Sequence, residues 1–133
     1  MASVVADTHA AVWYLLQSPR LSVTAGNRMA ATIAAGDPIL VPAICLVELV
    51  YLVEKGRIPR SDWEQLQAAL RQEDSGYRVV PLDEAIARGV ERVPRDQVPD
   101  MPDRIIAATA LHLDLPLVTR DGRIREAGLE VVW

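Results

Sequence analysis

Four short apolar segments recur along this chain, with helical sequence between them. They cover residues 3–6, 39–41, 77–82 and 115–119, and residues 129–133 form a fifth, shorter candidate. Continuous apolar runs of this length are typical of buried strands in a parallel sheet. Strands that alternate with helices predict an α/β fold, with a central parallel sheet of four to five strands and helices on both faces. The 133 residues suffice for a single domain, residues 1–133, with its own core.

Capping residues and helix breakers place the helices between these strands. We expect helices over residues 8–17, 23–35, 43–53 and 101–113, and two more that begin near residues 61 and 83. Their predicted N-caps are Thr8, Ser22, Ser61, Asp83 and Asp100. The helix at residues 101–113 carries the strongest start signal, because Pro102 stands in its first turn and Asp103 stands three residues after the cap.

Composition limits where the protein acts and what it binds. No apolar run approaches the roughly 18–20 residues needed to span a bilayer, and the first residues lack the basic and apolar regions of a signal peptide. The single cysteine, Cys45, excludes an internal disulfide and is expected in the core. We therefore expect a cytoplasmic protein with no membrane contact. The net charge of −4 argues against a broad basic surface for nucleic acid, although thirteen of the fourteen basic residues are arginines.

Four acidic side chains are expected at one edge of the predicted sheet. Asp7 ends the first strand, and Asp121 follows the fourth by two residues. Asp103 starts a helix whose preceding loop can cross the same edge, and Glu48 is the only charged residue in the apolar helix at residues 43–53. Ligands of open parallel sheets bind outside the carboxyl ends of the strands. We therefore expect these acids to converge there.

Each acid also has a purely structural explanation. Asp7 and Asp100 suit helix caps, Asp121 starts an Asp-Gly turn, and Glu48 suits an ion pair with an arginine. Clustered carboxylates repel one another unless a cation neutralises them, so a shared cation explains all of them at once. A set of carboxylates suits Mg²⁺, with Mn²⁺ as a substitute. His9 and His112 lack the spacing of a zinc site.

Four segments of the chain together resemble the PIN-domain family, and in particular the VapC-type toxins of bacterial toxin–antitoxin pairs. They occur in the family's order and cover nearly the whole chain. They are Val4-Val5-Ala6-Asp7-Thr8-His9, Val47-Glu48-Leu49, Pro102-Asp103-Arg104-Ile105-Ile106-Ala107-Ala108-Thr109-Ala110 and Leu117-Val118-Thr119-Arg120-Asp121.

The resemblance implies a single PIN-like domain that acts as a metal-dependent ribonuclease. Its acidic quartet would be Asp7, Glu48, Asp103 and Asp121, with Asp7 and Asp103 as the most direct Mg²⁺ ligands. Asp100 matches an additional acid, which caps the helix, binds a second ion or does both. Thr119 matches a hydroxyl residue that orients water or a ligand. Thr8 and Arg104 stand beside matched acids as supporting residues, and Arg104 would either pair with Glu48 or bind phosphate.

The resemblance also implies partners. Such toxins cleave RNA, form homodimers and are blocked by a cognate antitoxin protein. On this chain, the apolar helix around Leu46, Leu49, Val50 and Val53 is the expected dimer surface. The sequence departs from common relatives in the stretch at residues 97–102 and at Cys45, where serine is frequent. Neither departure removes an acid of the quartet.

The expected reaction is hydrolysis of RNA phosphodiesters by a metal-activated water that Glu48 or Asp121 positions or deprotonates. The arginines near the acids, at positions 104, 120, 123 and 125, would hold flanking phosphates. Three alternatives remain: a PIN-fold nuclease that processes RNA or DNA without being a toxin, a non-catalytic binding module, and a receiver-like or phosphatase-like aspartyl phosphoryl-transfer domain. An aspartyl phosphoryl-transfer domain requires a lysine at the edge of the sheet, but the only lysine, Lys55, lies at the far end of a predicted helix.

Overall fold

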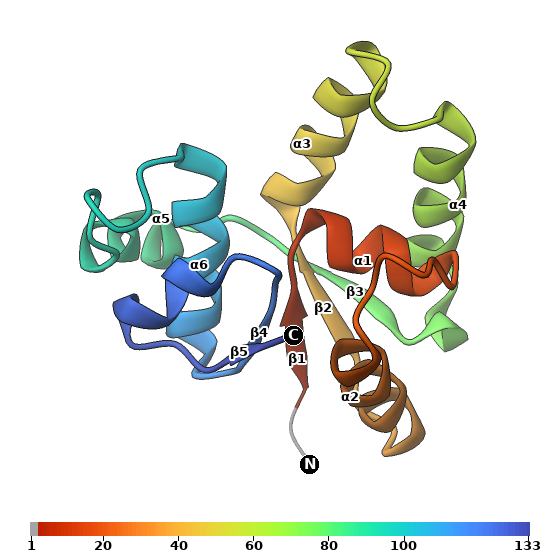
Figure 1. Ribbon diagram of the computed structural model, residues 1–133, viewed down its shortest axis with the longest axis horizontal. Helices are drawn as coiled ribbons and strands as arrows, with labels where there is room; N and C mark the ends of the chain where they lie inside the picture. The colour runs from red at the N-terminus through yellow and green to blue at the C-terminus, as the bar shows by residue number, and fades with distance from the viewer. Residues whose placement is uncertain (1–2) are drawn as a thin grey trace.

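A computed structural model describes residues 3–133 of the chain. Its centre is a five-stranded sheet in which all neighbouring strands pair in parallel, in the order β3-β2-β1-β4-β5 (Figure 1). The strands are β1 (Val4–Ala6), β2 (Ile39–Pro42), β3 (Tyr77–Val80), β4 (Leu117–Val118) and β5 (Val131–Val132). Four of the five lie within the segments predicted to form strands, and β2 continues one residue beyond its predicted end, to Pro42. The parallel α/β fold expected from the sequence is therefore confirmed.

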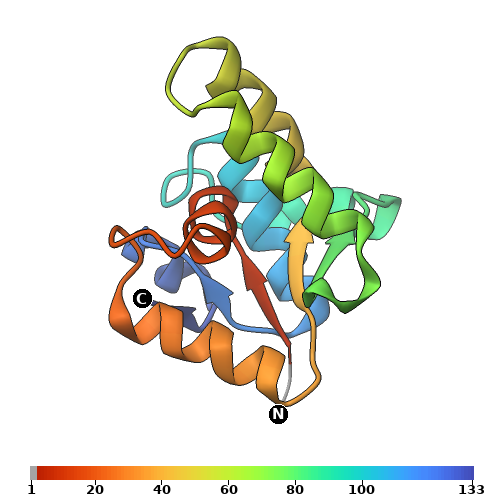
Figure 2. The ribbon, with the colours of Figure 1, turned by 90° about the vertical axis from the view of Figure 1, so that its right-hand side faces the viewer.

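Helices cover both faces of this sheet, with α1, α2 and α4 on one side and α5 and α6 on the other (Figures 1 and 2). The α-helices are α1 (Thr8–Leu15), α2 (Val23–Ala34), α3 (Ala43–Glu54), α4 (Arg60–Arg71), α5 (Glu84–Gly89) and α6 (Met101–Leu113). Three short 3₁₀ helices are η1 (Glu73–Ser75), η2 (Val90–Arg92) and η3 (Gly122–Ala127). Helices α3 and α4 form a hairpin that extends beyond the sheet (Figure 2). Within residues 3–133, no helix has both the length and the apolar character needed to cross a membrane.

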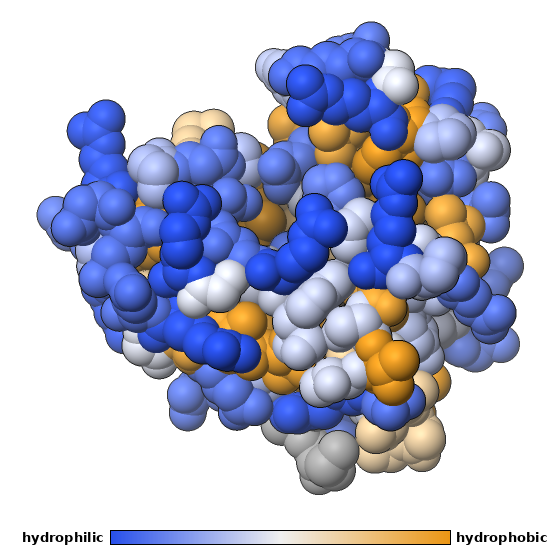
Figure 3. Space-filling view, viewed as in Figure 1, coloured by the Kyte–Doolittle hydropathy of each residue, from blue (hydrophilic) through white to orange (hydrophobic). Residues whose placement is uncertain are grey.

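The core forms where these helices pack against the strands. Val4, Val5, Ile39, Val41 and Leu117 are all fully buried, so the central strands contribute apolar side chains to both faces. This explains their continuous apolar sequence. Much of the molecular face in Figure 3 is hydrophilic, and the hydrophobic side chains visible there form small separate areas. Cys45 is fully buried in this core, as predicted.

Three of the five predicted caps are confirmed and two are wrong. Ser22, Asp83 and Asp100 each accept a hydrogen bond from a backbone N–H three residues later. At α1 the cap is Asp7 and not Thr8, because the Asp7 carboxylate, one residue earlier, accepts the Ala10 N–H at 2.9 Å. At α4 the helix already begins at Arg60, so Ser61 lies inside its first turn.

The apolar helix α3 divides its side chains differently from the predicted dimer surface. Leu49 is fully buried against the core and cannot face a second molecule. The exposed apolar residues of α3 are instead Val47 (49% exposed), Val50 (37%) and Tyr51 (58%). The sequence did not reveal this division, because nearly every residue of the helix is apolar and no polar face marks the solvent side.

Leu49 anchors the helix that carries Glu48, which makes it a test of the fold. We expect Leu49→Ala to lower the free energy of unfolding by about 2–5 kcal/mol, because it leaves a cavity in the core. Val47→Ala, on the exposed side of the same helix, should change it by less than about 0.5 kcal/mol. Urea unfolding followed by circular dichroism measures both. Equal losses in the two variants would contradict the orientation of α3.

Candidate active site

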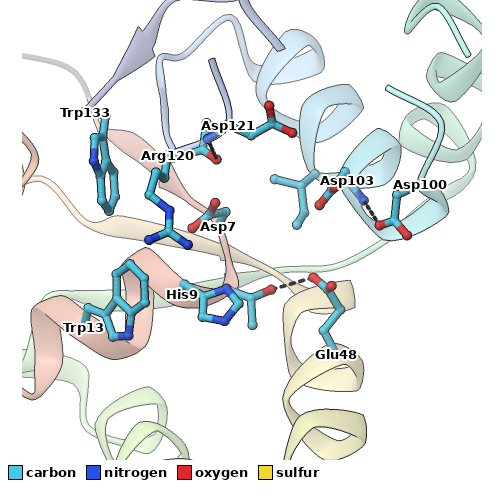
Figure 4. A pocket seen from close by; sticks show the side chains of 12 residues that line it. Asp7, His9, Trp13, Glu48, Asp100, Asp103, Arg120, Asp121 and Trp133 are labelled. Carbon is cyan, nitrogen blue, oxygen red and sulfur yellow. Dashed lines mark hydrogen bonds between the residues drawn. The ribbon is translucent and has the colours of Figure 1, made fainter. Parts of the chain in front are cut away.

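A pocket of about 290 Å³ opens at the carboxyl ends of β1, β2 and β4 (Figure 4). Five acids line it, from four separate segments: the end of β1, helix α3, the start of α6, and the turn after β4. The convergence expected from the sequence is therefore present. Its lining residues are Asp7, Thr8, His9, Trp13, Glu48, Asp100, Asp103, Ile106, Thr119, Arg120, Asp121 and Trp133.

Asp7 stands in the middle of the pocket and also caps α1 (Figure 4). Burial raises the pKa of its carboxyl group above the ordinary value. The Thr119 hydroxyl, the Ala10 N–H, His9 and Arg120 each oppose that rise, in decreasing order. The cap hydrogen bond uses one oxygen, Oδ1, so the carboxylate keeps acceptor sites for a ligand in the pocket.

Glu48 receives its hydrogen bond from a hydroxyl and not from an arginine. The Thr8 Oγ1 donates to Glu48 Oε1 at 2.6 Å, across the junction between α1 and α3. Thr8 is buried, so its side chain has a fixed place. Burial raises the pKa of Glu48, the Thr8 hydroxyl opposes this, and the negative charges of Asp100 and Asp7 add to it. Thr8 thus supports the site through Glu48 and does not cap a helix.

Asp103 is the centre of the acidic group. One carboxylate oxygen from each of Glu48, Asp100 and Asp103 lies within 4.8 Å of the other two. The Asp100 carboxylate accepts the Asp103 N–H at 3.3 Å as the cap of α6. Burial raises the pKa of Asp103 to about 7, and the charges of Asp100, Glu48, Asp121 and Asp7 all contribute.

Asp121 lies at the same opening but has its own cation. Its carboxylate accepts hydrogen bonds from the Arg123 backbone N–H at 3.1 Å and from the Arg123 guanidinium at 3.2 Å. The guanidinium is the main reason that the pKa of Asp121 is lowered. Thr119 Oγ1 accepts the Asp121 N–H at 3.1 Å and so fixes the turn after β4.

Arg104 does not reach the pocket. Its guanidinium donates to the backbone carbonyls of Val93, at 2.9 and 3.2 Å, and of Val90, at 3.1 Å. These contacts hold the segment before α6, so Arg104 does not pair with Glu48. The sequence left that pairing and a phosphate contact open as alternatives, and the guanidinium donors are instead used by backbone carbonyls. The side chain instead satisfies carbonyls at the end of η2.

These observations agree with comparisons to known proteins. A family model described as the PIN domain matches residues 4–129 of the chain. The chain belongs to the PIN-domain family. It is 33% identical over 129 residues to Ribonuclease VapC22 of Mycobacterium tuberculosis, a match that covers 94% of this chain and 92% of the relative.

Several solved structures have a similar fold. The chain matches VapBC2 from Rickettsia felis, solved bound to a DNA fragment from its promoter, with a TM-score of 0.72, 18% identity and coverage of 98% and 97% of the two chains. It matches VapBC-1 from nontypeable Haemophilus influenzae with a TM-score of 0.67, 15% identity and coverage of 98% and 96%. The family membership confirms the resemblance stated above and leaves no support for a receiver-like domain. Lys55 does not line the acidic pocket.

The acids of this PIN domain fit a hard divalent cation. Every candidate ligand is a carboxylate, which suits Mg²⁺ or Mn²⁺ better than zinc. One oxygen from each of Glu48, Asp100 and Asp103 lies within 4.8 Å of the other two, so this group would have to draw closer to bind one ion at the roughly 2.1 Å that Mg²⁺ requires. The pKa of Asp103 is raised first by burial and then by the negative charges of four neighbouring carboxylates, both of which a bound cation would offset.

The wall of the pocket that faces Glu48, Asp100 and Asp103 contains aromatic residues that we did not assign to a site from the sequence. His9 packs against Trp13, with ring centroids 5.2 Å apart, and Trp133 lies 6.0 Å from Trp13 on another side. His9 and Trp13 stand four residues apart and therefore share a face of α1. That spacing was the available signal. No local pattern connects them with Trp133, which approaches only through the pairing of β4 with β5.

The raised pKa of Asp103 predicts a pH dependence of stability in the metal-free protein. A carboxyl group whose pKa is higher in the folded state stabilises the fold fully below its unfolded value, near 3.8, and loses this contribution as pH rises through about 7. We therefore expect the free energy of unfolding, measured with urea in EDTA, to fall between pH 5 and pH 8. Asp103→Asn should flatten this decline, whereas Asp96→Asn, an exposed change before the same helix, should keep it. An unchanged decline in Asp103→Asn would contradict the assignment.

Proposed function

We propose that this PIN-domain nuclease is a Mg²⁺-dependent endoribonuclease and the toxin of a toxin–antitoxin pair that acts in the cytoplasm. One observation carries the proposal: Glu48, Asp100, Asp103, Asp7 and Asp121 meet in one pocket, with three of them close enough to share an ion. The 33%-identical relative, which matches over almost its whole length, is a ribonuclease. The similar solved structures from Rickettsia felis and Haemophilus influenzae are VapBC proteins, which supports an antitoxin partner for this chain.

The proposed metal ligands are Asp7, Glu48, Asp103 and Asp121, with Asp100 as an additional one. Asp103 would bind most directly, because it is buried and the charges of all four other acids act on it. Asp7 would bind beside it through the oxygen that the α1 cap leaves free. A bound Mg²⁺ would supply charge neutralisation, polarise the phosphate and acidify a water molecule; Mn²⁺ would be the substitute.

Glu48 is better suited than Asp121 to position and deprotonate the attacking water. The pKa of Glu48 is raised, so its carboxylate accepts a proton more readily near neutral pH. The pKa of Asp121 is lowered because the Arg123 guanidinium donates hydrogen bonds to both oxygens of that carboxylate. In the proposed reaction, the water proton goes to Glu48, the water oxygen bonds to phosphorus, and the bond from phosphorus to the ribose oxygen breaks. The leaving ribose oxygen takes up a proton from solvent and departs as a hydroxyl group. Thr8 keeps Glu48 oriented, and Thr119 holds the turn that carries Asp121.

The proposal predicts that isosteric removal of one central charge stops cleavage and leaves the fold intact. Asp7→Asn and Asp103→Asn should each lower Mg²⁺-dependent cleavage of total RNA by more than about 100-fold. Glu48→Gln should lower the rate by about 10² to 10⁴-fold, since it removes the proton acceptor. Asp96→Asn is the matched control, with the same change at an exposed acid outside the pocket. Primer extension that maps RNA ends after induced expression measures the loss. Full cleavage activity in Asp103→Asn, with an unchanged circular dichroism spectrum, would show that Asp103 is not an essential metal ligand.

We also propose that the protein forms a homodimer through the exposed apolar side of α3. Val47, Val50 and Tyr51 are exposed there, and Met101 at the start of α6 is 64% exposed beside Val47 and Tyr51 in a second pocket. A cluster of exposed apolar side chains is typical of an interface. Of the residues predicted for this surface, Val50 is retained, Leu49 belongs to the core, and Leu46 and Val53 are half-buried.

Introducing one charged side chain into the exposed apolar side of α3 tests the proposed dimer surface. We expect Val47→Asp to convert the protein to a monomer in analytical ultracentrifugation, because an unpaired carboxylate in an apolar interface is unfavourable by several kcal/mol. Val23→Asp is the matched control, since Val23 is 79% exposed at the start of α2, away from this cluster. A dimer that survives Val47→Asp, or that dissociates equally in both variants, would exclude this surface.

A further inference from the structure

The guanidinium groups of the four arginines near the acids, at positions 104, 120, 123 and 125, have different partners in the structure. Arg104 donates to the carbonyls before α6, Arg123 pairs with Asp121, and Arg125 donates to the Val131 carbonyl at 3.4 Å. Arg120 alone among the four lines the acidic pocket. Within residues 3–133, no carboxylate lies within 4.0 Å of its guanidinium. Its donors are therefore available to a ligand.

An aromatic ring holds the Arg120 guanidinium in place. Its central carbon lies 5.3 Å from the ring centroid of Trp13, within the range of a cation–π contact. Trp13 is only 8% exposed and packs against His9 and Trp133, so the ring cannot turn away. The guanidinium points into the pocket between Trp13 and Asp7 (Figure 4). The Trp13 ring thus orients the Arg120 guanidinium, and its hydrogen-bond donors stay available to a ligand.

Negative and positive side chains lie on different sides of the pocket. Glu48, Asp100 and Asp103 occupy one side, and Arg120 with the tryptophans occupies the other (Figure 4). In the part of the chain that the structure describes, no other arginine or lysine lines the pocket. An RNA strand that places one phosphate at the acids, through a cation, brings a neighbouring phosphate towards the side of Arg120. Guanidinium groups bind phosphate oxygens through paired hydrogen bonds.

We infer that Arg120 binds an RNA phosphate adjacent to the scissile one, and that Trp13 is a positioning residue that holds the guanidinium for this contact. The inference rests on the proposed RNA substrate and adds a substrate contact to it. Arg120 would fix the register of the strand over the acids, so that the scissile phosphate meets the metal ligands. The acidic side of the pocket binds the cation, and the aromatic side binds the strand.

Binding without cleavage tests this inference directly. The probe is a fluorescein-labelled single-stranded RNA of mixed sequence, titrated in EDTA at several salt concentrations, with anisotropy as the readout. Arg120→Ala should weaken binding roughly tenfold and reduce the slope of log K against log salt by about 0.7, the value for one lost phosphate contact with a single strand. Arg71→Ala, which removes an equal charge at the exposed end of α4, should leave the slope unchanged.

Two further variants separate phosphate binding from a merely structural role. Arg120→Lys should keep the salt slope, because it keeps the charge, but lower kcat/KM for cleavage, because an ammonium group lacks the planar fork and stacks less well. Trp13→Phe retains an aromatic core residue and should weaken RNA binding a few-fold in the native protein. In the Arg120→Ala background, Trp13→Phe should cause no additional loss, since the residue that it positions is gone.

The outcomes distinguish this inference from the proposed function. If the native protein cleaves RNA with Mg²⁺ but Arg120→Ala keeps the affinity and salt slope of Arg71→Ala, the phosphate contact is wrong and the ribonuclease proposal stands. An affinity loss without a change in slope, or additive effects of Trp13→Phe and Arg120→Ala, also overturns it. If the native protein neither binds nor cleaves RNA, both proposals fail.

Discussion

Repulsion among five carboxylates is the constraint on which the site depends. Burial raises the pKa of the Asp103 carboxyl group to about 7, and the charges of the other four acids add to this rise. Four of the acids have a local donor: the Ala10 N–H for Asp7, the Thr8 hydroxyl for Glu48, the Asp103 N–H for Asp100 and the Arg123 guanidinium for Asp121. Among the residues described, no hydrogen bond to the Asp103 carboxylate is present, so this is where a bound cation would relieve most repulsion.

The same hydrogen bonds change how a capping acid should be interpreted. From the sequence, an N-cap and a metal ligand are competing explanations for Asp7 and Asp100. In the structure both residues are caps and both line the pocket. A carboxylate has about four acceptor positions, and a cap uses one of them. The cap fixes the side-chain rotamer, and the remaining positions face the pocket, so a helix start is a natural place to hold an ionised ligand.

The fold could be predicted from the sequence because its signals are local. Unbroken apolar segments mark strands, and Ser22, Asp83 and Asp100 mark helix starts within a few residues. The errors concern choices that depend on distant residues. Thr8 bonds to Glu48, forty positions away, and not to its own helix. Arg104 reaches carbonyls that only the packing of η2 against α6 brings near. A sequence shows which groups need partners, but the tertiary arrangement decides which partner each one finds.

The placement of cations around the pocket follows from the same electrostatics. An arginine paired directly with the central acids would compete with a metal ion for their oxygens. Arg123 does pair with an acid, but with Asp121, outside the three-carboxylate group. Arg120 is held by the Trp13 ring, which attracts the guanidinium through its π electrons and has no negative charge to neutralise it. A protein with a net charge of −4 can thus present a positive contact beside an acidic cluster, because an aromatic side chain fixes the cation and, among the residues described, no carboxylate lies within ion-pair distance of it.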